Sequence, residues 1–306
     1  MPSRLWLTLV LLSLLPCGCT TTPEANAATL QSALRARIDG FRGSVGIYIR
    51  HLGNGTEVAM AADELFPTAS MIKVPLLGAL LAKVEAGRLD YHQELTYTKD
   101  RLYAGEDLLG SFADGQKVQL AKVAMLMITT SDNTASLWCQ ELAGTGSAVN
   151  TWLEQQGFAK TRVNSRTPGR EAAQREFGWG VTTPREMGEL LVAMREGRLQ
   201  SPAASEEMRR CLARIYWDAE ALSVIPPEVH TLSKQGAVNR SRSEVVLVHA
   251  PHGDYVFCVI TKDQKDTSWG RDNEGFVLLR DVAAMLWRHF EPDHPYSSPP
   301  GLERFW

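Results

Sequence analysis

The chain has 306 residues, of which 44% are hydrophobic and 22% are charged, so it can bury one large core or two interlocked ones. The net charge of -3 and a pI near 6.2 provide no overall basic field, and the arginines are scattered rather than gathered on one face. These features exclude a disordered or fibrous protein and make nucleic acid an unexpected partner.

Residues 1–19 have the pattern of an export signal: a positive start, a short apolar run from Leu5 to Leu15, and small residues before Cys19. Cys19 resembles the lipidated cysteine of bacterial lipoprotein signals, although Pro16 stands where leucine is usual. Ordinary cleavage within residues 25–28 is the alternative. Either interpretation predicts a protein beyond the inner membrane, in the periplasm, and the first adds a lipid anchor.

The elements predicted next are strands at both ends of the chain and helices between them. A helix is expected over 30–41, a hairpin over 43–50 and 56–61, helices from 70 to about 195, strands over 244–249 and 255–261, and a last helix over 276–290. This order predicts an α/β domain whose antiparallel sheet is built from both chain ends, with an all-α domain inserted and a cleft between them.

The domain boundaries follow from these elements. The expected division is a signal peptide at 1–19, a tether at 20–29, an α/β domain made of 30–66 and 205–290, an all-α domain at 67–204, and a proline-rich tail at 291–306.

The body of the chain contains Cys139, Cys211 and Cys258, with no C-x-x-C pair and no histidine cluster beside them. A metal site is therefore not expected. Outside the cytoplasm, three cysteines permit one disulfide and one thiol or three buried thiols. Apolar neighbours favour burial of Cys139 and Cys258.

Ser70 and Lys73 form the only S-x-x-K in the chain, at the change from strand to helix. Residues three apart share a helix face, so the Lys73 amine can lie beside the Ser70 hydroxyl and take its proton. A helix N-terminus also leaves the Ser70 N–H free for an oxyanion. The alternative is a plain helix cap followed by a surface lysine.

Two further short motifs follow in the chain. Ser131-Asp132-Asn133 lies between predicted helices, and Lys234-Gln235-Gly236 precedes a predicted strand. Each alone is as well explained by a cap or a turn. Together with S-x-x-K, and with Asp114-Gly115 and Thr182-Thr183-Pro184, they resemble the class A β-lactamases, members of the penicillin-recognising superfamily, over roughly residues 40 to 290.

This resemblance implies a role for each matching residue. Ser70 would be the nucleophile, Lys73 its base or proton relay, and Ser131 the hydroxyl that passes a proton to the leaving nitrogen. The residues implied in substrate binding are Asn133 for a side-chain amide, Lys234 for a carboxylate, Gly236 in the same motif, and Ala237, whose N–H would join that of Ser70 in an oxyanion hole. Tyr103 is expected either as a wall of the cleft or as a core aromatic.

The chain departs from the family at the group that activates the deacylating water. Thr167 stands before Pro168 where the family's glutamate would be, and Glu171 falls on the family's asparagine. Glu171 could replace the missing base or be an exposed loop acid paired with Arg170 or Arg175. Gln235 replaces a hydroxyl residue, for which Arg240 and Arg242 offer a compensating charge.

We therefore expect a serine hydrolase that acts on β-lactam amide bonds through an acyl-enzyme, with slow release because the loop glutamate is missing. The alternatives are an enzyme resembling D-alanyl-D-alanine peptidases and a non-catalytic penicillin-binding lipoprotein. No cofactor is expected. The partners expected are a β-lactam or cell-wall peptide and, through Cys19 only, a membrane; the protein is expected to be a monomer.

Overall fold

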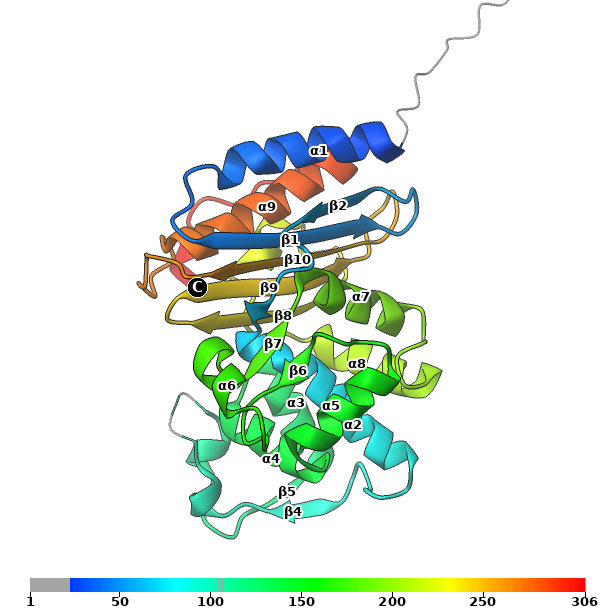
Figure 1. The fold of residues 1–306 in the computed structure, drawn as a ribbon, viewed down its shortest axis with the longest axis vertical. Coiled ribbons are helices and arrows are strands. Elements are labelled where there is room, and N and C mark those ends of the chain that lie inside the picture. The colour runs from blue at the N-terminus through cyan, green and yellow to red at the C-terminus, as the bar shows by residue number, and fades with distance from the viewer. Residues whose placement is uncertain (1–22, 104, 106, 306) are drawn as a thin grey trace, which may run out of the picture.

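Both ends of the chain build one sheet (Figure 1). The computed structural model describes residues 23–103, 105 and 107–305, so the predicted export signal and Cys19 lie outside the described residues. The sheet is antiparallel, with strand order β2-β1-β10-β9-β8. The strands are β1 (Ser44–His51), β2 (Glu57–Met60), β8 (Thr231–Val238), β9 (Ser241–Val248) and β10 (Tyr255–Lys262). The strand β8 is therefore an edge of the sheet.

Helices cover both faces of this sheet, which is why every residue of β9 is buried. Helices α1 (Pro23–Ile38) and α9 (Glu274–Phe290) lie on one face, and α7 (Pro184–Arg195) lies on the other (Figure 1). The helix α9 begins at Asn273, whose side chain accepts the N–H groups of Gly275 and Phe276. Its apolar stripe packs on the sheet.

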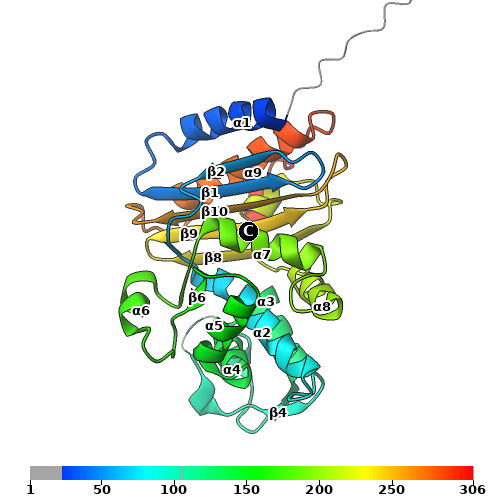
Figure 2. The same ribbon diagram turned by 45° about the vertical axis from the view of Figure 1, so that its right-hand side comes forward.

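The helical part of the molecule is built around α2 (Lys73–Glu85), whose residues 73–81 are all buried. Close packing needs a glycine there, since a Cβ at Gly78 would lie 2.3 Å from the Trp152 ring. The helices around α2 are α3 (Leu120–Thr129), α4 (Asn133–Leu142), α5 (Thr145–Gln155) and α8 (Pro202–Leu212). The short helix α6 (Glu171–Phe177) projects from the side of this group in Figure 2.

Short strands interrupt the helical part, which the sequence analysis predicted to be all helical. They are β3 (Phe66–Pro67), β6 (Arg162–Val163) and β7 (Gly180–Thr182) in one small sheet, and β4 (Glu94–Thr96) and β5 (Lys117–Gln119) in another. Each has only two or three residues, too few for an alternating pattern to be visible. The remaining prediction, an α/β domain with an inserted helical one, is confirmed.

Element ends differ modestly from those predicted. The first helix begins seven positions earlier than predicted and ends at Ile38 rather than Phe41, because Gly40 adopts a left-handed conformation with φ of 80°. All three body cysteines are buried free thiols, which confirms the second of the two alternatives. Among the described residues, no helix combines the length and apolar character that crossing a membrane requires.

Candidate active site

Ser70 lies in a single turn of 3₁₀ helix, Ala69–Ile72, that runs directly into α2. In a 3₁₀ turn, residues three apart lie on the same side, so Ser70 and Lys73 face one region. Ala69 has a φ of 43°, and Ser131, across the cleft, has a φ of 61°. Left-handed conformations are costly for residues with a Cβ and gather at functional sites. Both serine motifs are therefore held in strained backbone.

Lys73 is fully buried, and its amine is directed at the second motif. Its Nζ donates to the backbone oxygen of Ser131, to Ser131 Oγ at 3.1 Å and to Asn133 Oδ1 at 2.8 Å. Burial lowers the pKa of Lys73 to about 7, although Asp107 and Asp132 act in the opposite direction. Near neutral pH, a large share of this amine is thus unprotonated and able to accept a proton.

Ser131 links the first and third motifs. The fully buried Lys234 donates through Nζ to Ser131 Oγ at 3.1 Å and to the Gln235 oxygen at 2.9 Å. Burial and the neighbouring Lys73 keep the pKa of Lys234 well below its usual value. Because the Ser131 hydroxyl lies between the amines of Lys73 and Lys234, whose pKa values are both lowered, it can pass a proton from one amine to the other.

Two carboxylates shape the Ser131 turn. Asp132 caps α4 by accepting the N–H of Ala135 at 2.7 Å, and it also accepts the N–H of Leu109 at 2.9 Å. Asp107 accepts the N–H groups of Asn133 and Thr134 at 2.9 and 2.7 Å. The sequence analysis missed Asp107, since a cap supplied by a distant loop leaves no local pattern.

Gly236 brings the edge strand β8 against the nucleophile. A Cβ at this position would lie 2.8 Å from the Thr68 oxygen and 2.9 Å from the Ser70 nitrogen. Both are backbone atoms that cannot yield, so only glycine permits this approach. The next residue, Ala237, lines the same cleft as Ser70. The N–H groups of Ser70 and Ala237 can therefore face one bound carbonyl oxygen.

A cleft of about 960 Å³ opens at Ser70, Ser131 and Asn133. Its inner wall is β8, from Gln235 to Ala237. The rest of its lining includes aromatic and basic side chains, those of Tyr216, Trp217, Trp269, Phe276, Phe305, Arg271 and Arg280. Trp217 is held beside the Ser131 motif because its Nε1 donates to the Thr130 oxygen at 2.8 Å.

Arg242 is placed behind this aromatic end rather than in the open cleft. Its guanidinium lies 4.5 Å from the Trp269 ring centre and 4.7 Å from that of Phe276. It donates to the oxygens of Val238, Ser241 and Ser268. Arg240 instead donates to the oxygens of Asp263 and Gln264. Neither arginine is among the residues that line the cleft, so the predicted charge compensation for Gln235 remains a prediction.

The described lining of the cleft contains no residue of the loop 164–178, and none between Asn133 and Ile215. Thr167 is buried and donates to the Ser165 oxygen at 2.9 Å. Its hydroxyl lies against α5, because a Cβ at Gly146 would be only 1.8 Å from it. Thr167, which stands at the position of the family's glutamate, therefore packs against α5.

Asn164 closes the base of this loop. Its side-chain oxygen accepts Arg170 Nε at 3.0 Å, and its amide nitrogen donates to the Gly178 oxygen at 3.2 Å. Its backbone N–H donates to the Trp179 oxygen at 2.8 Å. Hydrogen bonds of the Asn164 side chain and backbone thus hold the base of the loop together.

Glu171 and Tyr103, both predicted as site residues, lie outside the cleft lining. Glu171 begins α6 and is exposed, and its carboxylate accepts the Gly169 N–H at 3.0 Å. Its pKa is lowered by the backbone N–H groups of Glu171 and Gly169. The Tyr103 ring packs edge-on against Trp179, with centres 5.1 Å apart. The structure brings Ser70, Lys73, Ser131, Asn133 and Lys234 together but does not place Glu171 with them.

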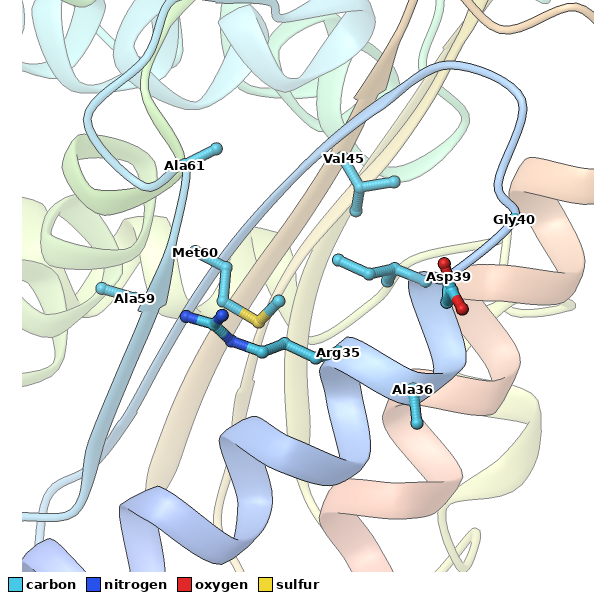
Figure 3. Close-up of a pocket in the computed structure, with 9 residues that line it drawn as sticks. Arg35, Ala36, Asp39, Gly40, Val45, Ala59, Met60 and Ala61 are labelled. Carbon is cyan, nitrogen blue, oxygen red and sulfur yellow. The ribbon is translucent and has the colours of Figure 1, made fainter.

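A second hollow, of about 770 Å³, lies between the end of α1 and the β1–β2 edge (Figure 3). Figure 3 shows Arg35 and Met60 side by side there, with Val45 and Asp39 nearby. It contains none of the predicted site residues, and its wide opening gives a ligand little to be enclosed by.

Comparison with known proteins finds a matching family and solved structures with the same fold. Residues 29–290 match the sequence model of the beta-lactamase enzyme family. A mutant of PBP-A, solved as an acyl-enzyme complex with penicillin G, is 24% identical and has a TM-score of 0.76, with 87% of this chain and 97% of that chain covered.

Two further solved structures have the same fold. A beta-lactamase from Sphaerobacter thermophilus is 23% identical, with a TM-score of 0.75 and coverage of 89% of this chain and 99% of that one. A class A beta-lactamase from Mycobacterium abscessus is 17% identical, with a TM-score of 0.76 and coverage of 85% and 99%.

Proposed function

The chain belongs to the beta-lactamase enzyme family, and on this premise we propose that it is an active-site serine hydrolase that opens β-lactam amide bonds through an acyl-enzyme on Ser70. The observation that carries the proposal is the shared hydrogen bonding of Lys73 and Lys234 to Ser131 Oγ, at 3.1 Å each. If Lys73 were a surface lysine and Ser70 a plain helix cap, nothing would require two buried amines to share the Ser131 hydroxyl.

Acylation uses groups that all line or border the cleft. The Ser70 hydroxyl attacks the lactam carbonyl while its proton passes to the neutral amine of Lys73. The carbonyl oxygen becomes negative and is held by the N–H groups of Ser70 and Ala237. Ser131 then gives its proton to the departing nitrogen and recovers one from an adjacent lysine, which leaves the acyl group on Ser70.

Among the residues that the structure describes, release of the acyl group has no comparable machinery. A water molecule must attack the ester, and general-base assistance is typically worth a factor of roughly 10² to 10⁴. Thr167 faces α5, and Glu171 is exposed outside the cleft lining. We therefore propose fast acylation followed by slow deacylation.

The intact mass of the purified protein, followed during exposure to benzylpenicillin, tests both steps. The expected result is an adduct with the mass of the intact drug that forms within seconds to minutes and returns to the unmodified mass over a much longer time. Failure of any adduct to form would contradict the proposal, and would favour a non-catalytic protein. Equally fast formation and loss would contradict only the slow release.

A second candidate function is that of a cell-wall peptidase acting on D-alanyl-D-alanine ends. The orientation of the 164–178 loop favours it, since an enzyme whose natural acyl group leaves by another route does not need the loop base. Incubation with a D-alanyl-D-alanine peptide distinguishes the two. Release of D-alanine at a rate above that of benzylpenicillin turnover would establish the peptidase as the main activity.

We also propose that Cys19 anchors the protein to a bacterial membrane, on the periplasmic side, because it follows a short apolar run and a glycine. Cys19→Ser should move the protein from the membrane fraction to the soluble fraction of fractionated cells. A soluble wild-type protein would show that cleavage occurs further on instead.

A further inference from the structure

Histidine and carboxylate side chains gather at the opposite end of β9 from Ser243, the strand partner of Gly236. His252 lies in the turn between β9 and β10, and Glu291 and His294 directly follow α9. One ligand atom from each of these three residues lies within 4.8 Å of the other two. Nothing in the proposed reaction uses this cluster.

The carboxylate lies at the base of the cluster and the imidazoles lie at its mouth. Glu291 is completely buried, whereas the His252 side chain is 50% exposed and His294 is exposed. Glu291 Oε1 accepts the backbone N–H of His252 at 2.8 Å, and Oε2 lies 2.7 Å from His252 Nδ1. One carboxylate oxygen is thus fixed by the backbone while the other faces an imidazole nitrogen.

The backbone after α9 holds the other two ligands in place. The backbone N–H of His294 donates to the backbone oxygen of Glu291 at 3.0 Å. Trp287 Nε1 donates to the His294 oxygen at 2.7 Å. The rings of His252 and His294 have their centres 5.6 Å apart. The three side chains therefore start close to a common point, which lowers the entropic cost of binding one ion.

We propose that His252, Glu291 and His294 bind a zinc ion, with solvent as the fourth ligand. Two imidazoles and one carboxylate are a set that zinc accepts, whereas magnesium and calcium prefer oxygen alone. Ligands at 2.0–2.1 Å from a tetrahedral ion are about 3.3 Å apart, so Nδ1 and Oε2 need to separate by only a fraction of an ångström. The half-exposed His252 ring has room for that movement.

Zinc would join the β9–β10 turn to the segment that follows α9. That segment also contacts the body of the protein where Ser298 Oγ donates to the backbone oxygen of Ser223, and its Phe305 lines the cleft. The ion would therefore be structural, and its loss should loosen the C-terminal segment rather than stop acylation at Ser70. A simple His252–Glu291 ion pair is the competing explanation.

Calorimetric titration of the untagged, metal-free protein with zinc chloride tests the proposal. His294→Ala removes one ligand but leaves the His252–Glu291 pair, and His92→Ala, an exposed histidine outside the cluster, is the matched control. One zinc per chain should bind to the wild type and to the control. Binding to His294→Ala should be weaker by at least about tenfold, since even outer-shell partners contribute that much.

X-ray absorption of the zinc-loaded protein provides the second readout. It should show nitrogen and oxygen ligands at about 2.0–2.1 Å and no sulfur ligand near 2.3 Å. Equal zinc affinity in the wild type and His294→Ala, no measurable binding to either, or a sulfur ligand would each overturn the proposal. The first two results would leave the ion pair as the explanation of the cluster.

Discussion

The Ser70–Lys73–Ser131–Lys234 cluster and the loop of residues 164–178 differ in the direction their polar groups face. Both are rich in hydrogen bonds and both contain buried polar side chains. In the first, both lysine amines donate to the Ser131 hydroxyl at the cleft, whereas the polar groups of the second bond to α4 and to the loop's own backbone, with Thr167 packed against α5. Ser165, for example, is bonded to Gln140 of α4 through both its hydroxyl and its oxygen.

On the proposed function, this difference predicts that the two chemical steps are separable. Formation of the acyl-enzyme would depend on a compact cluster that the three motifs supply. Its hydrolysis would be slow, because no residue of the 164–178 loop is among the described residues that line the cleft. Variants in the first region should therefore change acylation strongly, and variants in the second should change little.

Ser70→Ala tests the first region with the largest expected effect. Covalent labelling by benzylpenicillin should disappear, because the proposal assigns the attack to Ser70 and only proton transfer to Ser131. Mass spectrometry of the intact protein measures this directly. An adduct on the Ser70→Ala protein would place the nucleophile elsewhere and break the comparison.

Gly236→Ala should lower the acylation rate by roughly 10²-fold, the lower end of the cost of losing one oxyanion donor. The added Cβ would press on the backbone at Thr68 and Ser70 and move β8 away. Val238→Ala, in the same strand at an exposed position, is the control and should acylate normally. Stopped-flow measurement of acylation gives both rates, and equal rates would show that the close approach of β8 is not needed.

The acylation rate should depend on pH through Lys73, whose pKa is lowered to about 7 mainly by burial. The neutral amine is the base, so the rate should be constant above that value and fall by about tenfold for each unit below it. Because Lys73 and Lys234 share Ser131, the measured value belongs to the pair. A rate that is constant from pH 5 to 9 would exclude Lys73 as the base.

Glu171→Gln has the smallest expected effect. The carboxylate is exposed and accepts the Gly169 N–H within the loop, so deacylation should change by less than about threefold. Decay of the isolated adduct measures this rate. Accumulation of adduct by a factor of 10² or more would show instead that Glu171 reaches the ester, and the contrast between the two regions would need revision.

Much of the site was predictable because it is encoded in short contiguous motifs. S-x-x-K and Ser131-Asp132-Asn133 each lie where a helix begins, Lys234-Gln235-Gly236 lies within β8, and the fold brings the three together. The strands and the last helix were also visible, since their apolar periodicity is long enough to read.

The parts that could not be predicted depend on contacts between distant residues. The Asp107 carboxylate accepts the N–H of Asn133, which lies 26 residues further along the chain. The Thr167 hydroxyl packs against Gly146 of α5, where the missing side chain leaves room for it. The strand character of Thr231–Val238 was missed around Lys234, because polar and small residues interrupt its pattern. No local propensity reports any of these contacts.

The pairing of Ser44 with Lys262 also affects how the sheet forms while the chain is synthesised. During synthesis, β1 and β2 emerge as an isolated hairpin, which is marginal in water, and the strand that completes them is among the last to be made. A sheet with such high contact order forms slowly and only after translation. A chain cut anywhere before Tyr255 would therefore lack both the central strand that joins its two ends and the helix α9 that packs on the sheet.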